Sequence, residues 1–232
     1  MDTPAQQDRA THVVIFANGE FTPPPGVEDH LHGRRIICAD GGTRHALALG
    51  LTPHVIIGDL DSVPGEMVET LAGRGTEILR FPRDKDQTDL ELALAYAIER
   101  GAEDILLLGL LGGRLDQTLA NVFLLALPEW ERARLWLADG PDTAYLLRSG
   151  DTLTLTGRRG DTVSLLPLTP TVTGVSTQGL RWPLQDATLH FGRTLTVSNE
   201  LVGRAAEVRV GTGKMLVVIR DTSYKSDNSN AR

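Results

Sequence analysis

The feature that most constrains this chain is a pairing that recurs five times in its first 147 residues. Each time, an apolar run is followed at once by a cluster of glycine and polar residues. These runs with their clusters cover 12–19, 34–42, 54–62, 76–89 and 104–114, and helical spacing is found at 43–50, 65–75, 90–101 and 115–127. Near-continuous apolar strands that alternate with helices predict a parallel sheet covered on both faces.

The pattern changes after Arg148. Short alternating runs occupy 152–156, 162–168, 187–191, 194–199, 206–210 and 214–220, and turn-forming clusters separate them without a convincing helix. That pattern is typical of a small all-β sandwich or barrel. We therefore expect an α/β fold with a Rossmann-like parallel-sheet domain over 1–147, a β-sandwich domain over 148–221 and a flexible tail over 222–232.

Composition limits the classes of partner and the location. A formal charge of -7 and a pI near 5.4 argue against nucleic-acid binding, which needs a basic surface. The single cysteine, Cys38, excludes an intramolecular disulfide, and its apolar surroundings predict a buried structural thiol. The first residues lack an apolar signal core, and no segment approaches the roughly 20 apolar residues of a membrane span. We expect a cytoplasmic protein without a membrane segment.

The polar clusters share one position relative to the predicted strands. They lie at Asn18-Gly19, at Asp40-Gly41-Gly42, around Asp59, in "DKDQTD" and in "GGRLDQ", always directly after a strand. In an open parallel sheet, the loops at the carboxyl ends of the strands surround a common crevice in which ligands bind. The sequence therefore predicts one ligand site built from all five clusters.

Two of these clusters carry carboxylates. In "GDLDS", Asp59 and Asp61 share one face if the chain stays extended, and their mutual repulsion calls for a positive charge between them. The stretch "DKDQTD" adds Asp86 and Asp89. A shared Mg²⁺ accounts for the whole set, since this ion prefers a few carboxylate oxygens together with substrate phosphates and water.

A purely structural role is the alternative for part of this set. Thr88 and Glu91 fit a capping box, and Asp89 in the first turn suits the helix dipole. That interpretation leaves the other acids unexplained. The six histidines are scattered and show no zinc spacing, so we expect His45 and His54 to be surface or packing residues.

The stretch "LLGGRLDQTLAN" has the composition of an anion site. Gly112 and Gly113 let backbone amides approach a ligand, and the helix that follows offers its N-terminus to anions. Arg114 can grip phosphate oxygens with two parallel hydrogen bonds. Gln117 and Asn121 share a polar face of that helix. A glycine turn with a solvated helix face is the alternative, and the neighbouring carboxylates favour phosphate binding.

Other motifs admit other functions. The "GTGK" at 211–214 lacks the upstream glycines of a P-loop and lies between β runs, so we expect a hairpin turn there. The "DLDSV" stretch matches the pattern of haloacid-dehalogenase-like phosphatases, with Asp59 as the nucleophile, but it follows the third strand rather than the first. A nucleotide-binding sensor is a non-catalytic alternative.

The motifs taken together resemble those of the thiamine pyrophosphokinase family. "ANGE", "ADGGTRHALALG", "PHVIIGDLDS", "KDQTDLELAL" and "GGRLDQTLAN" occur in the family's order, and "STQGLRWPLQDATLHFG" and "VSNE" match its β half. The resemblance covers nearly the whole chain. Two departures are Thr43-Arg44, where the family usually has Ala-Asn, and Gln117, where bacterial members often have His.

The resemblance implies transfer of a diphosphoryl group from ATP to thiamine, with Mg²⁺ required, in a homodimer whose active sites lie at the subunit interface. It implies Mg²⁺ ligands at Asp59, Asp61 and Asp89, with Asp86 a further member, and catalytic roles for the three ligands and Arg114. The implied nucleotide contacts are Asn18, Asp40, Gly41, Gly42, Thr88, Gly112, Gly113, Asp116 and Gln117. For thiamine, the candidates are Trp182, Ser198 and Asn199, of which Trp182 has core packing of the sandwich as its alternative.

Overall fold

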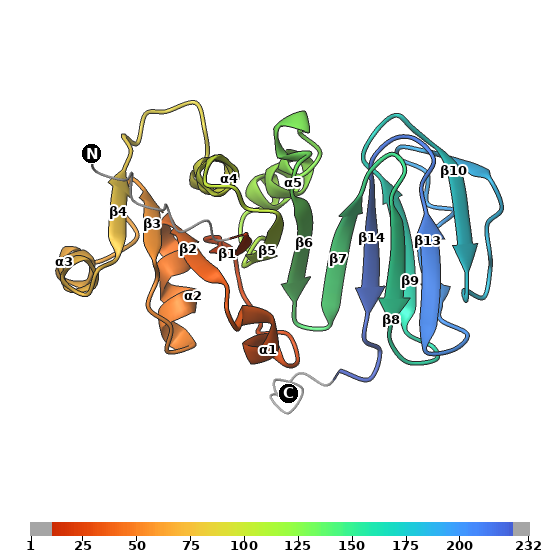
Figure 1. Cartoon of the computed structure of the whole chain (residues 1–232), viewed down its shortest axis with the longest axis horizontal. Coiled ribbons are helices and arrows are strands. Elements are labelled where there is room, and N and C mark those ends of the chain that lie inside the picture. The colour runs from red at the N-terminus through yellow and green to blue at the C-terminus, as the bar shows by residue number, and fades with distance from the viewer. Residues whose placement is uncertain (1–10, 225–232) are drawn as a thin grey trace, which may run out of the picture. The chain divides into compact units, whose positions relative to one another are not determined.

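The computed structural model describes residues 11–224 (Figure 1). The chain folds into two compact units. Unit 1 runs up to Phe21 and takes in 28–121 and 127–135, and unit 2 takes in 22–27, 122–126 and the chain from Trp136 onward. The division between Leu135 and Trp136 falls earlier than the predicted domain boundary at 147. Most of the predicted tail over 222–232, and the first ten residues, lie outside the described residues.

Unit 1 contains the predicted parallel sheet. Its strand order is β5-β1-β2-β3-β4, and every neighbouring pair is parallel. Burial explains the apolar runs, because Ile15, Ile37 and Leu107 are fully buried within them. The strands are β1 (His12–Phe16), β2 (Arg35–Ala39), β3 (Val55–Gly58), β4 (Glu77–Arg80) and β5 (Asp104–Leu108).

Helices connect these strands, and the chain reverses direction across the sheet between β4 and β5. Right-handed crossovers then place the helix before β5 on the opposite face from the helices before it. Figure 1 accordingly draws α4 on one side of the strands and α2 on the other. The helical elements are α1 (Val27–Leu31), η1 (Asp40–Gly42), α2 (Thr43–Ala48), α3 (Gly65–Gly73), α4 (Asp89–Glu99), α5 (Leu115–Leu124) and η2 (Pro128–Trp130).

Local signals explain the helices that the sequence predicts. Gly50, at φ +71°, follows the last turn of α2 as the predicted C-terminal glycine. Thr88 caps α4 by accepting a hydrogen bond from the Glu91 amide at 3.2 Å. The short helices α1, η1 and η2 were not predicted, since three to five residues are too few to show a helical period.

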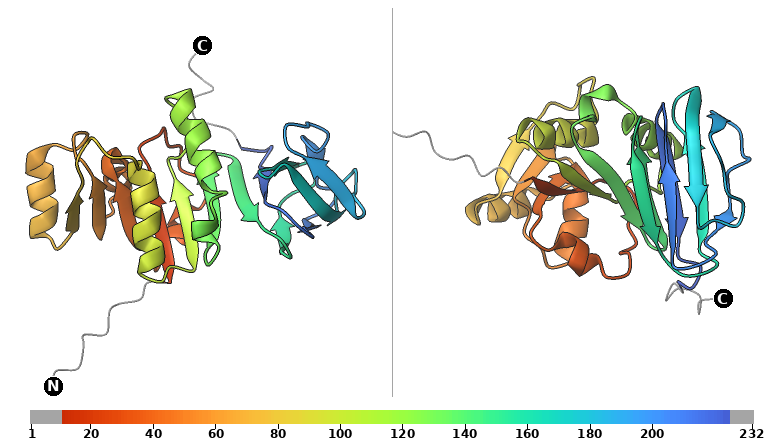
Figure 2. Two further views of the ribbon diagram at one scale, coloured as in Figure 1. Left: turned by 90° about the horizontal axis from the view of Figure 1, so that it is seen from above. Right: turned by 45° about the vertical axis from the view of Figure 1, so that its right-hand side comes forward.

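Unit 2 is antiparallel and has two sheets. One orders its strands β6-β7-β14-β9-β12 and the other β11-β10-β13-β8 (Figures 1 and 2). Buried side chains from both sheets, among them Val163, Val175 and Val217, form one core. The strands are β6 (Arg134–Asp139), β7 (Asp142–Leu147), β8 (Thr152–Thr156), β9 (Thr162–Pro167), β10 (Thr171–Gln178), β11 (Ala187–His190), β12 (Asn199–Glu200), β13 (Ala205–Arg209) and β14 (Met215–Arg220).

Three expectations for this half need correction. The antiparallel pairing begins with β7, before Arg148, because Gly140 turns the chain back after β6 at φ +50°. The strand expected over 194–199 is a loop that leaves only the two residues of β12, since Leu195 is 85% exposed and Ser198 has φ +63°. The "GTGK" turn joins strands of different sheets and is therefore not a hairpin.

The single cysteine and two histidines have structural roles, as expected. Cys38 is fully buried in β2, and burial raises the pKa of its thiol, which keeps the sulfur protonated. His54 Nδ1 accepts a hydrogen bond from the Ile36 amide at 3.0 Å, and His45 Nε2 lies 2.9 Å from the Gly19 carbonyl oxygen. None of the helices within residues 11–224 is both long and apolar enough to cross a membrane.

Candidate active site

A cavity of about 510 Å³ opens at the carboxyl ends of the parallel strands of unit 1. All five loops that leave these strands contribute to its wall, as the sequence predicts. Polar side chains dominate the lining, and among the lining residues are Asn18, Glu20, Asp40, Arg44, Asp59, Asp61, Arg83, Lys85, Thr88, Asp89, Gly112, Gly113, Arg114, Gln117 and Asn121.

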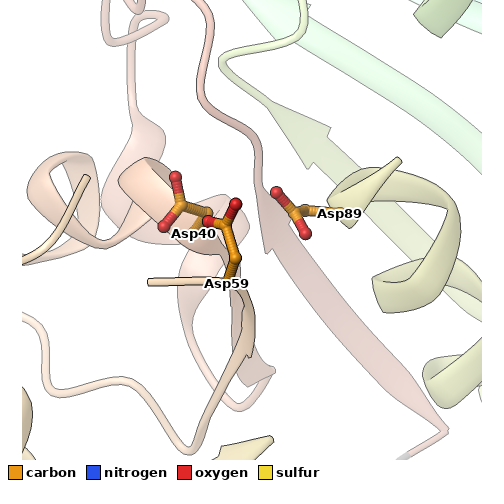
Figure 3. Close-up of side chains that lie close together, drawn as sticks. All are labelled: Asp40, Asp59 and Asp89. Carbon is orange, nitrogen blue, oxygen red and sulfur yellow. The ribbon is translucent and has the colours of Figure 1, made fainter. Parts of the chain in front are cut away.

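Three carboxylates converge on one side of this cavity. Figure 3 shows the carboxyl groups of Asp40 and Asp59 side by side, with that of Asp89 facing them from the start of α4. Each offers one oxygen, and these oxygens lie within 4.8 Å of one another. The three residues follow β2, β3 and β4 in the chain, so only the parallel sheet brings them together. We call them the carboxylate cluster.

The cluster has the properties of a cation site. Asp40 is 3% exposed, and Oδ1 of Asp40 and Oδ1 of Asp89 are buried without a hydrogen-bond donor. Buried polar oxygens normally accept a hydrogen bond, so two neighbouring carboxylate oxygens that accept none fit the ligands of a cation. Gly58 leaves the space free, because a Cβ on it would lie 2.9 Å from Asp40 Cβ and 3.1 Å from Asp89 Cγ. Oxygen ligands in this number suit Mg²⁺.

Opposing effects act on the pKa of Asp89, and the net result is a rise. Burial raises the pKa of Asp89, the contact with Lys85 opposes that rise, and the negative charges of Asp40 and Asp59 add to it. Lys85 Nζ lies 3.0 Å from Asp89 Oδ1 as an ion pair, although without the alignment of a hydrogen bond. A divalent cation would remove the repulsion among the three acids.

Asp89 combines the two roles that the sequence offers as alternatives. It is the first residue of α4, directly after the capping Thr88, so its charge lies at the positive end of the helix dipole. The same position directs its carboxyl group to Asp40 and Asp59. Asp86, by contrast, is exposed and lies outside both the cluster and the cavity wall.

Asp61 has a different setting from the one expected. The strand β3 ends at Gly58, and Leu60 takes φ +63°, so the chain does not stay extended between the two acids. The Asp61 amide donates a hydrogen bond to Asp59 Oδ1 at 3.2 Å, and the exposed Asp61 side chain lines the cavity outside the cluster. Because of this turn, the carboxylate that lies beside Asp59 is that of Asp40 and not that of Asp61. The metal role of Asp61 stays a prediction.

The segment before α5 forms another part of the cavity wall. Gly112 and Gly113 line it with φ of +78° and +71°, a backbone conformation that residues other than glycine rarely adopt. Arg114 lines it as well, and its guanidinium pairs with Asp116 at 2.5 Å while 72% of the side chain is exposed. Hydrogen bonding to Asp116 raises the pKa of Arg114, so the guanidinium carries its charge throughout.

The polar face of α5 serves the fold as well as the cavity. Gln117 and Asn121 both line the cavity, as their spacing predicts. Asn121 is buried and donates from Nδ2 to the Leu110 carbonyl oxygen at 3.0 Å, which ties α5 to the beginning of the loop after β5. Asp116 uses its carboxylate on Arg114 and on the Gln117 amide, and it is not part of the lining.

The loop after β1 is held by Arg44. Its guanidinium donates to Asn18 Oδ1, to the Asn18 carbonyl at 3.2 Å and to the Gly19 carbonyl at 2.9 Å. Gly41 allows this arrangement, because a Cβ on it would lie 2.3 Å from Asn18 Oδ1. Gly41 and Gly42 are both buried and lie outside the cavity wall, so they pack the loop against its neighbour.

Sequence reasoning missed four charged residues of the cavity. Glu20, Arg44, Arg83 and Lys85 all line it. Asp40, predicted as a nucleotide contact, is a member of the carboxylate cluster. A signal existed for Lys85, which lies inside "DKDQTD", and for Glu20, which directly follows Asn18-Gly19. No signal existed for Arg83, because a single basic residue in a charged loop is ordinary.

The residues predicted for thiamine lie in unit 2. Trp182 is 54% exposed, so core packing, the alternative for this residue, is wrong. Its backbone is fixed by Asn199, which accepts from the Trp182 amide at 3.1 Å and donates to its carbonyl at 2.7 Å. The Arg181 guanidinium lies 4.8 Å from the Trp182 ring centre. The Ser198 amide donates to Ser164 Oγ at 3.0 Å.

The parallel sheet and the contents of its cavity define a class. Carboxylates that can hold a cation, basic side chains and a glycine-containing wall at one sheet edge are typical of an enzyme that transfers phosphoryl groups. Two family models match the chain. The thiamin pyrophosphokinase catalytic domain covers residues 31–137, and the thiamin pyrophosphokinase vitamin B1 binding domain covers residues 152–217.

Known proteins agree with these family models. Thiamine pyrophosphokinase of Bacillus subtilis (strain 168) is 28% identical over 186 residues, which cover 80% of this chain and 86% of the relative. Thiamine pyrophosphokinase 3 of Oryza sativa subsp. japonica is 30% identical over 187 residues, 70% of this chain and 69% of the relative. The crystal structure of thiamin pyrophosphokinase from Geobacillus thermodenitrificans has a TM-score of 0.76 at 29% identity, covering 92% of this chain and 99% of that one.

The chain belongs to the thiamine pyrophosphokinase family. It is an enzyme of the transferase class that serves thiamine diphosphate biosynthesis. The fold agrees, since the crystal structure of the Bacillus subtilis protein superimposes with a TM-score of 0.79 over 91% of this chain.

Proposed function

We propose that the cavity of unit 1 binds ATP with Mg²⁺ and transfers its diphosphoryl group to the hydroxyl oxygen of thiamine, which gives thiamine diphosphate and AMP. The observation that carries this proposal is the carboxylate cluster, in which two buried oxygens lack a hydrogen-bond donor, at the edge where all five strand loops meet. Bound there, Mg²⁺ would neutralise phosphate charge and orient the group in transfer.

The residues of the chain supply binding and positioning. Asp59 and Asp89, with Asp40, hold the cation, and Asp61 is a proposed further ligand from the cavity wall. The backbone at Gly112 and Gly113, with Arg114, holds the triphosphate. Diphosphoryl transfer requires little covalent work from a protein, so the chemistry depends on in-line placement and charge stabilisation.

The remaining cavity residues orient the nucleotide. Asn18, Thr88 and Gln117 line the wall with groups that can donate and accept hydrogen bonds. Gly41, Gly42, Asp86 and Asp116 remain proposed contacts of lower weight, because they lie outside the wall. We propose that a carboxylate of the cluster accepts the proton of the attacking hydroxyl.

We propose that thiamine contacts Trp182, Ser198 and Asn199, and that the protein is a homodimer with its active sites at the subunit interface. An exposed tryptophan on a backbone held by two hydrogen bonds offers a rigid face to a cationic ring. We propose that the Rossmann-like unit carries the nucleotide site and that the β-sandwich unit carries the thiamine contacts. We also propose a cytoplasmic location, which the free, buried thiol of Cys38 supports.

One reaction mixture tests the function. The protein is incubated with ATP, Mg²⁺ and thiamine, and the products are resolved by chromatography. AMP and thiamine diphosphate in equal amounts are the expected result. Phosphate without AMP, or an aspartyl-phosphate on Asp59, would instead indicate a phosphatase, and nucleotide binding without turnover would indicate a sensor.

A further inference from the structure

Lys85 is the cation that lies against the carboxylate cluster. Its Nζ is 3.0 Å from Asp89 Oδ1 and 3.2 Å from the Pro82 carbonyl oxygen, and its side chain is 15% exposed. The other cavity cations have different settings. Arg114 pairs with Asp116, and Arg44 donates to the loop after β1. Within residues 11–224, Lys85 is the only basic side chain that forms an ion pair with a member of the cluster.

The contact is more than a pair along a helix. Lys85 and Asp89 have the spacing of helical neighbours, but α4 begins only at Asp89, so Lys85 lies in the preceding loop. That loop turns tightly, with the Lys85 amide donating to the Arg83 carbonyl at 3.1 Å. The turn brings the ammonium group back over the start of the helix. The position of Lys85 therefore follows from the loop and not from helical periodicity.

An ammonium ion and a divalent cation compete for this place. The Asp89 carboxylate offers one of its two oxygens to the cluster, and Lys85 contacts Oδ1 of the same carboxylate. Two cations at one carboxylate repel each other strongly in a half-buried site. Lysine is a point charge on a flexible stem, so its ammonium group can leave without moving the backbone.

We propose that Lys85 is a resident counter-ion of the carboxylate cluster. Without metal it offsets the repulsion among Asp40, Asp59 and Asp89, and when a divalent cation binds it withdraws from Asp89 and turns to the phosphate oxygens of the nucleotide. Lys85 thereby couples binding of the cation to binding of the nucleotide. The inference rests on the proposed metal site of the cluster.

The test measures binding of Mn²⁺ alone to the full-length protein stripped of metal, with free Mn²⁺ followed by electron paramagnetic resonance. Lys85→Met keeps the buried stem and removes the charge. We expect this variant to bind Mn²⁺ about tenfold more tightly than the wild type, since a competing charge is gone. Its unfolding temperature in chelator should fall below that of the wild type, and Mn²⁺ should close the gap.

Two further variants separate charge from bulk. Arg83→Met removes an exposed cation of the same loop that has no ion pair within the described residues, and we expect its Mn²⁺ affinity to stay within about twofold of the wild type. Lys85→Arg keeps the charge and should also bind Mn²⁺ like the wild type. If Lys85→Arg tightens binding as much as Lys85→Met, the charge is not the cause and the proposal fails.

The remaining outcomes are equally decisive. Unchanged or weaker Mn²⁺ binding by Lys85→Met, beside normal binding by the wild type, overturns the counter-ion role and leaves the metal site intact. A wild-type protein that binds no Mn²⁺ overturns both. A Lys85→Met protein that folds with Mn²⁺ but not in chelator supports the proposal, whereas one that folds in neither medium assigns Lys85 to the architecture of the loop and overturns it.

Discussion

Gly58 lies directly beneath Asp89, so close that a Cβ on the glycine would come within 3.1 Å of the aspartate's carboxyl carbon. The same added atom would approach Asp40 Cβ to 2.9 Å. Gly58 also has φ +151°, a conformation that other residues adopt with strain. The glycine at the end of β3 is therefore required by the carboxylate cluster on two independent counts.

Gly58→Ala should separate the cluster while leaving most of the sheet intact. We expect the free energy of unfolding of the variant to fall by about 1–3 kcal/mol because of backbone strain and crowding. Mn²⁺ binding should weaken by about tenfold or more, because Asp40 and Asp89 are pushed apart. Calorimetry and Mn²⁺ titration measure the two effects. Gly65→Ala is the control, since a Cβ there meets nothing within 4 Å.

Conversion of the acids to amides distinguishes the cluster from its neighbour Asp61. Asp40→Asn and Asp59→Asn should each weaken Mn²⁺ binding by about tenfold or more and reduce turnover by orders of magnitude, since each removes a charged ligand. Asp61→Asn should reduce turnover with a smaller effect on Mn²⁺ affinity, because Asp61 lies outside the cluster. Near-normal activity in both Asp59→Asn and Asp61→Asn would contradict the metal site.

Arg114→Ala tests the grip on the transferring group. The side chain is 72% exposed and its one ion pair within residues 11–224 is with Asp116, so folding stability should change little. Loss of a donor to the transferring group should lower kcat/KM for ATP by about 100-fold to 1000-fold. A variant with normal kinetics and reduced stability would show that Arg114 is structural.

Arg44→Ala tests the support of the loop after β1. Three hydrogen bonds from one guanidinium fix Asn18 and Gly19 at the cavity. Their loss should destabilise the protein by about 1–2 kcal/mol and raise the KM for ATP more than it lowers kcat. Arg44→Lys should restore little, because an ammonium group cannot reproduce a planar fork. Equal KM values in both variants and the wild type would remove Arg44 from substrate positioning.

Trp182→Ala tests the proposed thiamine contact. An exposed aromatic face beside a cationic ring contributes about 0.5–2 kcal/mol, so the KM for thiamine should rise by about threefold to thirtyfold. The KM for ATP should stay within about twofold in the same assay. Asn199→Ala, which frees the Trp182 backbone, should reproduce part of the effect, and Trp182→Phe should retain most of the affinity. A parallel rise in both KM values would point to general damage.

Much of the fold and site follows from local pattern. The apolar runs around Ile15, Ile37 and Leu107 predict a buried parallel sheet, and they lie fully buried in one. The positions of Asp59, Asp89 and the glycines of "GGRLDQ" directly after strands predict a shared crevice, and these residues line one cavity. Such features are readable because burial and strand direction leave their mark on adjacent residues of the chain.

Other features depend on tertiary contacts that leave no signal in the local sequence. The predicted extended chain at Asp59 and Asp61 is wrong because Leu60 turns the backbone, and no local sequence signal marks a leucine at positive φ. The expected strand over 194–199 does not form, apart from Asn199 in β12. An alternating pattern gives a strand only where a neighbouring strand is available to pair with it. Lys85 meets Asp89 only through the turn of its loop.

The sequence by itself thus determined the family, the parallel sheet and the edge at which the ligand loops gather. The tertiary structure alone decided which acids meet, because Asp40, Asp59 and Asp89 come from three separate loops, and Gly58 makes the room in which they converge. The periodicity of apolar residues indicates which side of a helix or strand is buried. The distance between two loops depends instead on the order in which whole strands pair in the sheet.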